Sequence, residues 1–183
     1  MCGATEIVNS DLYVQLTSAL ETYDKIYDEV FESVHERMAG NGFATKMDIS
    51  ALLFWKRIET KKFRMHLLET SDSKVRSVTQ AAFADGMSNA DRLDAMRPLP
   101  GCKSGIAVPT TILAAFDPGR FGIYDERALK ALKRLRVPNC KCTISRGDIF
   151  LDHLARLATE MSVVGNSWTP RQVDMALFKL GKS

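Results

Sequence analysis

The sequence has no long apolar run and no start typical of a secreted protein. Its 183 residues contain no stretch close to the roughly 18 apolar residues that cross a bilayer. Residues 1–11, MCGATEIVNSD, lack the basic segment followed by an apolar one that marks a secretory signal. We therefore expect a cytoplasmic protein that has no membrane partner.

Cysteine and histidine are also scarce, with four and three residues respectively. Cys140 and Cys142 are too close together for a usual zinc pair, and no histidine lies near them in the sequence. An iron–sulfur cluster would need four thiolates at suitable spacing. The sequence therefore predicts free thiols, with no metal and no cofactor.

Strand-like alternation is nearly absent, whereas apolar residues recur at spacings of three and four along most of the chain. One such stripe runs from Leu16 to Met38 and predicts a single long helix that ends at GNG, residues 40–42. With 45% apolar and 26% charged residues, the composition is that of an ordinary globular protein. No repeat or flexible linker is apparent, so we predict one compact all-α domain over residues 1–183.

Several further helices are expected from their end signals. Asp48 and Asn89 are plausible caps, and residues 59–73 are predicted to be a connector before a helix around 74–84. A helix is also expected over about 148–163. The last helix is the best marked: Thr169 is its N-cap, Pro170 its first residue, Gln172 closes a capping box, and Gly181 lies at its end.

The charge of the chain is distributed unevenly. Residues 1–45 hold eight acidic and two basic residues, which gives this segment a charge of −6. Because the whole chain has a net charge of +3, residues 46–183 carry +9. A basic body with an acidic N-terminal helix fits a polyanion bound on one face. An ordinary distribution of solvated charge explains the pattern equally well.

One stretch, LPGCKSGIAVPTTILAAFDPGRFGIYD at residues 99–125, resembles the helix-hairpin-helix (HhH-GPD) DNA glycosylase superfamily. In that superfamily the second hairpin glycine stands about twenty residues before the catalytic aspartate, and Gly105 stands twenty before Asp125. LLFWKRI at 52–58 and TPRQVDMALFKLGK at 169–182 are similar to sequences of a compact bacterial branch without an iron–sulfur cluster.

The resemblance implies a helical two-lobed fold with the active-site cleft between its lobes. The middle lobe would span about 45–124, the N- and C-terminal helices would form the second lobe, and the hairpin would cover about 99–107. Two departures matter: Lys103 replaces the first hairpin glycine, and Ala107 occupies the place of the lysine nucleophile in lyase-competent members. The resemblance therefore implies a monofunctional enzyme that leaves an abasic site.

The chemistry expected of these residues can be argued separately. A glycine-containing turn at a helix start exposes backbone N–H groups suited to a DNA phosphate, which nominates Gly101, Lys103, Ser104 and Gly105. Asp125 would stabilise the positive charge that develops at C1′ as a flipped-out base departs. An aspartate at a helix start is, taken alone, more often a cap.

Candidates for the base pocket and for the DNA backbone lie on either side of this acid. Trp55 could stack on a base or pack in the core, and Lys56 could reach the base or a phosphate. Tyr124 is a pocket candidate that could equally face the core. The run ERALKALKRLR that follows Asp125 predicts a basic face along DNA or a merely solvated one, formed by Arg127, Lys130, Lys133 and Arg134.

The resemblance thus implies an enzyme whose partner is double-stranded DNA containing a damaged or modified base, and we expect no obligate protein partner. Its role would be DNA repair or defence against phage DNA with modified bases. The altered hairpin and the missing lysine leave an alternative, a helix-hairpin-helix DNA-binding protein without catalytic activity. A third possibility is an unrelated helical protein with a coincidental motif.

Overall fold

The computed structural model describes residues 10–58, 61–135, 146–165 and 167–182. Across these ranges the chain is helical, with no strand, which confirms the all-α class. None of the described helices is long and apolar enough to cross a membrane. The elements in chain order are α1 Ser10–Glu21, η1 Lys25–Asp28, α2 Glu29–Asn41, α3 Lys46–Trp55, α4 Lys61–Glu69, α5 Asp72–Phe83, α6 Asn89–Ala95, α7 Ala107–Phe116, α8 Glu126–Arg134, α9 Gly147–Val164 and α10 Pro170–Leu180.

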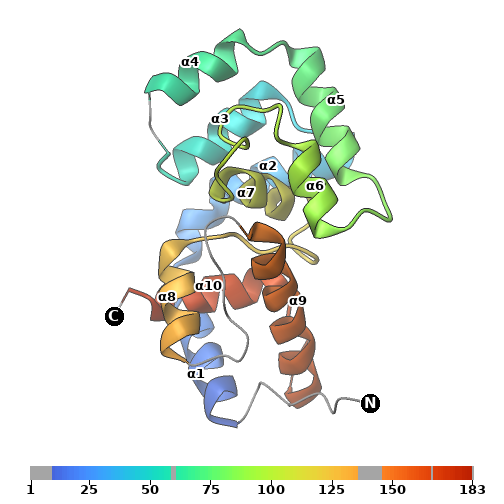
Figure 1. The fold of residues 1–183 in the computed structure, drawn as a ribbon. Helices are drawn as coiled ribbons and strands as arrows, with labels where there is room; N and C mark the ends of the chain where they lie inside the picture. The colour runs from blue at the N-terminus through green and yellow to red at the C-terminus, as the bar shows by residue number, and fades with distance from the viewer. Residues whose placement is uncertain (1–9, 59–60, 136–145, 166, 183) are drawn as a thin grey trace.

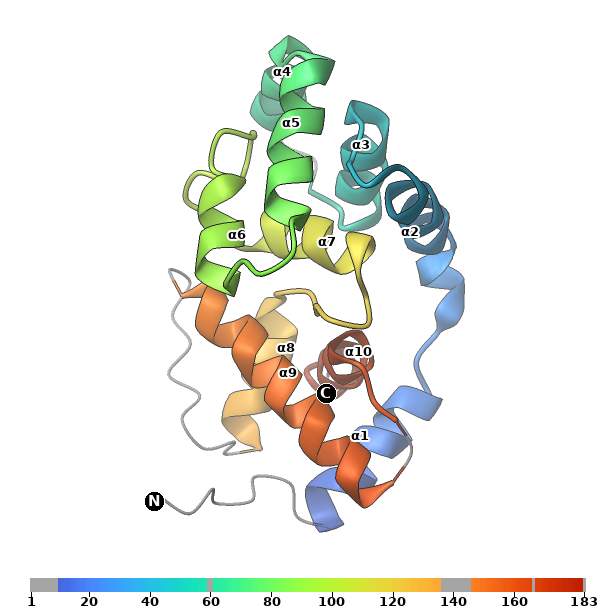
Figure 2. The same cartoon turned by 90° about the vertical axis from the view of Figure 1, so that its right-hand side faces the viewer.

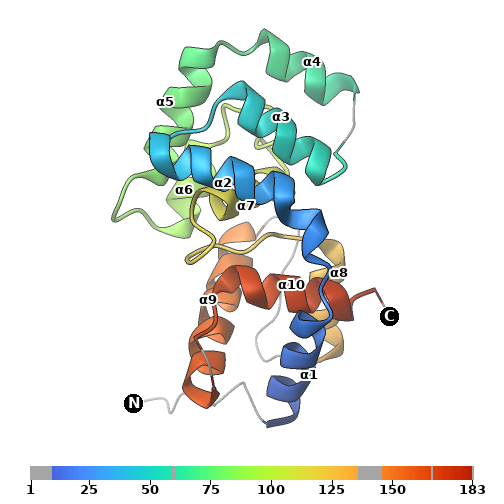
Figure 3. The same cartoon turned by 180° about the vertical axis from the view of Figure 1, so that it is seen from behind.

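The buried apolar side chains form two clusters. The first lies among α2, α3, α5 and α7, in the upper half of Figure 1, and α7 is buried along nearly its whole length. The second lies below it, where α10 packs against α1, α8 and α9 (Figure 3). The chain passes between the clusters at Ile123 and Tyr124, immediately before Asp125. The predicted limits of 45–124 for the upper unit leave out α2, which packs in the first cluster.

The predicted long N-terminal helix is in fact two helices separated by a turn. Thr22 Oγ1 donates to Ser18 O and to Ala19 O at the end of α1, and Asp24 caps η1 by accepting from Ile26 N at 3.2 Å. These side chains compete with the helical backbone for hydrogen bonds. The apolar stripe is therefore divided: Leu16 is buried in the second cluster and the α2 residues in the first.

The end signals were predicted with mixed success. The predicted cap, Pro170 start and capping box of α10 are confirmed, and α9 occupies its expected range. The caps of α3 and α6 are Thr45 and Ser88, so the predictions of Asp48 and Asn89 were wrong by a few residues. Asp48 instead completes a capping box with Thr45. The predicted connector 59–73 contains α4, whose only buried apolar side chain is Leu67.

The predicted hairpin is the connection between α6 and α7 (Figure 2). Gly101 has a φ of 75°, and a Cβ there would overlap the Phe63 ring, so this turn requires glycine. Cys102 is buried beside it, and the loss of solvent raises the pKa of its thiol to about 12. The other three cysteines, Cys2, Cys140 and Cys142, lie outside the described residues.

Candidate functional site

The extended segment 121–125 delivers Asp125 to the start of α8. Outside helices and strands, the buried backbone N–H groups of such a segment still need hydrogen-bond acceptors, and side chains can supply them. Ile123 N donates to Asp174 Oδ2 on α10 at 2.7 Å, and Tyr124 N donates to Thr110 Oγ1 on α7 at 3.1 Å. The segment is therefore held from both sides just before the acid.

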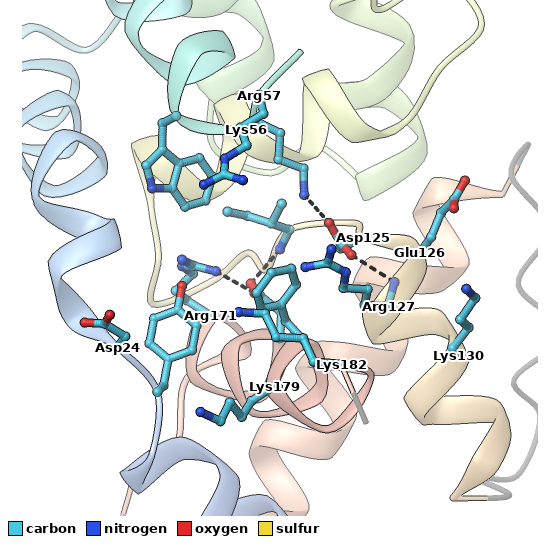
Figure 4. Close-up of a pocket in the computed structure, with 15 residues that line it drawn as sticks. Asp24, Lys56, Arg57, Asp125, Glu126, Arg127, Lys130, Arg171, Lys179 and Lys182 are labelled. Atoms are coloured by element: carbon cyan, nitrogen blue, oxygen red, sulfur yellow. Dashed lines mark hydrogen bonds and ion pairs between the residues drawn. The ribbon is translucent and has the colours of Figure 1, made fainter.

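Both carboxylate oxygens of Asp125 are engaged. Oδ1 accepts from Arg127 N at 2.9 Å, so the residue is the N-cap of α8. Oδ2 accepts from Lys56 Nζ at 2.9 Å, and the two side chains are 24% and 13% exposed respectively. Lys56 comes from the C-terminal end of α3, 69 residues earlier in the chain (Figure 4). Asp125 is thus a helix cap and an ion-pair partner at the same time.

This pair lies in the wall of a cavity of about 710 Å³, a volume within the usual range of small-ligand pockets. Four segments line it: the α1–η1 turn, the end of α3, the stretch from 123 into α8, and α10 together with Lys182, two residues beyond its end (Figure 4). The lining residues are Tyr23, Asp24, Trp55, Lys56, Arg57, Ile123, Asp125, Glu126, Arg127, Lys130, Arg171, Asp174, Phe178, Lys179 and Lys182. The cavity therefore lies where the two clusters meet.

The cavity is basic. Seven of the lining residues are Lys or Arg and four are Asp or Glu, so its lining carries a net charge of +3. Arg127 and Lys182 also lie near the Phe178 ring, at 5.2 and 4.8 Å from its centroid. A lining of this kind attracts a polyanion and offers aromatic surface beside the charges.

A buried ionic network forms the floor. Arg171 pairs with Asp174 on its own helix and with Asp28 at the end of η1, 3.0 Å away, and Tyr23 OH donates to Asp28 Oδ1 at 3.2 Å. Burial raises the pKa of Asp174 to about 6, although the neighbouring Arg171 opposes that rise. Burial likewise raises the pKa of Tyr23 to about 12. The network joins η1 to α10 beneath the cavity.

Trp55 lies at the boundary between the first cluster and the cavity, so it has both of the environments that were expected for it. Its ring packs against Phe31 in the first cluster, with centroids 5.2 Å apart, and also lines the cavity. The Arg171 guanidinium lies 5.5 Å from the Trp55 ring centroid. The ring thus packs in the core on one side and lines the cavity, beside Arg171, on the other.

Tyr124 is not a cavity residue, and its prediction as one was wrong. It is 5% exposed and packs edge-on against Phe150 in the second cluster, 5.1 Å between centroids. In an extended segment successive side chains point to opposite sides. Because Ile123 and Asp125 line the cavity, Tyr124 faces the core.

The predicted DNA-backbone residues are spread over three places. Arg127 and Lys130 line the cavity, whereas Arg134 Nη2 donates to Leu180 O at the end of α10, 2.6 Å away, and Lys133 is exposed. Arg134 therefore also has a structural role. The four hairpin residues lie outside the cavity lining, before α7, whose N-cap makes no side-chain hydrogen bond. These hairpin residues are Gly101, Lys103, Ser104 and Gly105.

Sequence reasoning missed much of the α10 contribution. Arg171, Phe178, Lys179 and Lys182 were not singled out, although they lie within 169–182, one of the segments that carried the resemblance. Their recurrence at spacings of three and four, as at 171, 174, 178 and 182, places them on one side of that helix and is the signal that could have indicated them. Among the described residues, no group of three or more His, Cys, Asp or Glu side chains could hold a metal ion.

Comparison of the chain with protein-family models, with curated proteins and with solved structures gives no match. The resemblance to HhH-GPD proteins therefore stays a prediction. The features of the described residues that bear on function are the cavity, its charge and the Lys56–Asp125 pair.

Proposed function

We propose that this protein is a DNA glycosylase. It would hydrolyse the N-glycosidic bond of a flipped-out damaged or modified base in duplex DNA and leave an abasic site. The observation that carries the proposal is the Asp125 carboxylate, oriented by Arg127 N and Lys56 Nζ, in the wall of a basic cavity. The two clusters with a cavity at their junction also support the two-lobed HhH-GPD arrangement.

The chemistry uses groups that the cavity presents. As the base leaves, C1′ gains oxocarbenium character, and the Asp125 carboxylate stabilises that charge and orients the attacking water. Extrusion of the nucleotide costs a few kcal/mol, which stacking of the base on Trp55 offsets in part. The cationic lining holds the adjoining phosphates, without reading sequence.

The hairpin supplies a second phosphate contact in this proposal. Lys103 and Ser104 are exposed, and the uncapped N-terminus of α7 follows them. Backbone N–H groups at a helix N-terminus favour an anion. A phosphate there would position the duplex, while the cavity receives the extruded nucleotide.

The test is base release from a panel of duplexes that carry different lesions and modified cytosines, analysed with and without alkali. Asp125→Asn removes the charge but keeps a side chain that caps helices as well. Asp94→Asn is the matched control, because Asp94 is an exposed acid of α6 outside the cavity lining. We expect Asp125→Asn to lower base release by about 100-fold or more and Asp94→Asn to leave it unchanged.

An alternative is favoured by one observation: both Asp125 oxygens already have partners, as in a purely structural cap. On this alternative the chain is a helix-hairpin-helix DNA-binding protein without catalytic activity. It predicts salt-dependent DNA binding by wild type and Asp125→Asn alike, with no base released from any duplex. Base release that requires Asp125 would exclude it. The panel also separates damaged bases from phage-type modified bases as substrates.

A further inference from the structure

Helix α4 leaves two apolar side chains uncovered. Its nine residues are fewer than an isolated helix needs, so its stability has to come from packing. Leu67 is its only buried apolar residue and Phe63 is half-buried, whereas Met65 and Leu68 are exposed. Lys46 Nζ donates to Leu68 O at 2.9 Å and connects the end of α4 to α3. Part of the apolar surface of α4 therefore faces solvent.

Helix α3 adds to this open apolar surface. Met47 and Phe54 are seven residues apart, about two helical turns, so they lie on the same side of α3. Both are exposed, Phe54 to 71%. Four of the nine large apolar side chains that the described residues expose thus belong to α3 and α4, which pack against each other. Apolar side chains that gather in this way, rather than scatter singly, mark an interaction surface.

Unlike charges flank this surface, because α3 lies between α2 and α4 (Figure 3). The exposed acids of α2, Glu29, Glu32 and Glu36, recur at spacings of three and four and so lie on one side of that helix. Arg37 of α2 is paired with Asp48 of α3 at 2.8 Å. Helix α4 has three basic residues and one acidic residue, a net charge of +2. The order across the three helices is therefore acidic, apolar and basic.

We propose that this face, formed by α2, α3 and α4, binds a second copy of the chain in a two-fold dimer. A two-fold axis in the plane of contact and parallel to α3 places α2 of each copy against α4 of the other, with the apolar residues of both α3 helices between them. The occupant is a second copy because the face is its own complement: acidic opposite basic about an apolar middle. The dimer gives a role to the acidic N-terminal segment, which DNA binding does not use.

The size of the face sets the strength of the association. At 1.5 Å per residue the 13 residues of α2 are about 20 Å long, and three neighbouring helices span about 28 Å. Each copy therefore offers about 600 Å², or about 1,200 Å² for the pair, the lower end of specific interfaces. A face of this size favours a weak, reversible dimer whose population depends on protein concentration.

The dimer is independent of the proposed function. The seven side chains that carry the argument, namely Glu29, Glu32, Glu36, Met47, Phe54, Met65 and Leu68, all lie outside the cavity lining. In Figure 3, α2 and α3 are on the side of the molecule that faces the viewer, in front of the connection between α6 and α7. A second copy on this face therefore leaves both the cavity and the predicted hairpin accessible.

Sedimentation equilibrium of the whole chain at increasing concentration measures the association. We expect the mass to rise from 20.4 kDa towards twice that value, and the association to weaken at about 1 M salt, where the Debye length is about 3 Å. Phe54→Glu introduces a charge at the apolar middle and should raise the dissociation constant of the dimer by about tenfold or more. Val163→Glu is the matched control, because Val163 is an exposed apolar residue of α9, and it should leave the constant unchanged.

Charge reversal tests whether the acidic and basic edges meet. Glu32→Lys and Arg64→Glu each place like charges across the contact and should each weaken the dimer several-fold. Combined in one chain, the two substitutions exchange the signs and should restore the wild-type dissociation constant to within about twofold. Both side chains are exposed, so neither substitution disturbs the core.

Three results would overturn the proposal. The first is a wild-type protein that stays monomeric up to about 1 mM, the weakest association that these measurements follow. The second is a dimer that Phe54→Glu leaves intact, which would place the contact elsewhere. The third is a double charge reversal that weakens the dimer further instead of restoring it. Base release by the monomer would leave the proposed function untouched in each case.

Discussion

Gly122 permits the close approach that positions Asp125, so its replacement by alanine tests the architecture of the site. A Cβ at this position would overlap Leu154 Cδ1 and would lie 2.7 Å from Pro170 O and 3.1 Å from Asp174 Oδ2. Pro170 O belongs to the backbone at the start of α10, which cannot move aside cheaply. Gly122 must therefore shift, together with the neighbouring hydrogen bond from Ile123 N to Asp174.

The cost can be worked from these contacts. Overpacking costs about 1–3 kcal/mol, and a weakened hydrogen bond to a charged acceptor adds about 1.5 kcal/mol, while the stiffer unfolded chain returns about 0.5 kcal/mol. We expect Gly122→Ala to lower the free energy of unfolding by about 3 kcal/mol. Urea unfolding, followed by tryptophan fluorescence, measures it if the m-value is unchanged.

Gly40→Ala is the matched control, because a Cβ at Gly40 in α2 meets no atom within 4 Å. Its helical position predicts a gain of about 0.5–1 kcal/mol. The two substitutions are chemically identical, so opposite signs isolate the close approach at residue 122. A Gly122→Ala protein within about 0.5 kcal/mol of wild type would refute the argument that tight packing fixes this segment.

Three further changes probe the surroundings of the site. The pKa of Asp174 is about 6 in the folded protein, whereas the usual value is 3.8. Between pH 4 and 6 the folded state therefore binds the carboxyl proton more tightly than the unfolded state does. The free energy of unfolding should therefore fall by up to about 3 kcal/mol as pH rises from 4 to 6. This dependence on pH should vanish in Asp174→Asn. Urea unfolding of both proteins between pH 4 and 7 measures the two free energies. Arg171→Met leaves two buried carboxylates without their cation and should lower the free energy of unfolding at pH 7 by about 3–5 kcal/mol, measured by the same urea assay. A smaller loss would mean that water reaches the network. Arg57 has a φ of 58°, in the left-handed region that favours glycine. Arg57→Gly relieves this strain and should raise the melting temperature, which corresponds to a gain of about 1 kcal/mol in the free energy of unfolding. A lower melting temperature would contradict the left-handed geometry.

Helical periodicity predicted the class and most helices, but it could not locate the break after α1. The apolar stripe keeps its spacing through residues 22–28, so the local pattern favours one continuous helix. What opposes it is the hydrogen bonding of Thr22 and Asp24 to the local backbone, together with the burial of Asp28 by Arg171, 143 residues away. An interaction at such a separation leaves no periodic trace in either segment. Helix α4 was missed because its apolar pattern is weak. Of its side chains, only Leu67 is a buried apolar residue.

The sequence predicted single residues of the site but not the contacts between them. Asp125, Trp55 and Lys56 were each singled out, and the structure brings all three to one cavity. The contact between Lys56 and Asp125 joins positions 69 apart, which spacing rules cannot relate. Tyr124, by contrast, could have been excluded from the sequence, because an extended segment that directs Asp125 to the cavity directs its neighbour away.

Among the described residues, the Arg171 network and the Lys56–Asp125 pair both connect the two clusters, and they differ in how deeply they are buried. Arg171 is buried between its two carboxylates, so separating those groups costs several kcal/mol and keeps η1 fixed to α10. The side chains of Lys56 and Asp125 are 13% and 24% exposed, so water reaches this pair more readily than the buried network and separating it costs less. Under the proposed function, a nucleotide that enters the cavity would separate the amine from the carboxylate more readily than it could open the network beneath them. The more solvated pair is the one that faces the reacting carbon in the proposed chemistry, and the buried network holds the elements that carry both of its partners.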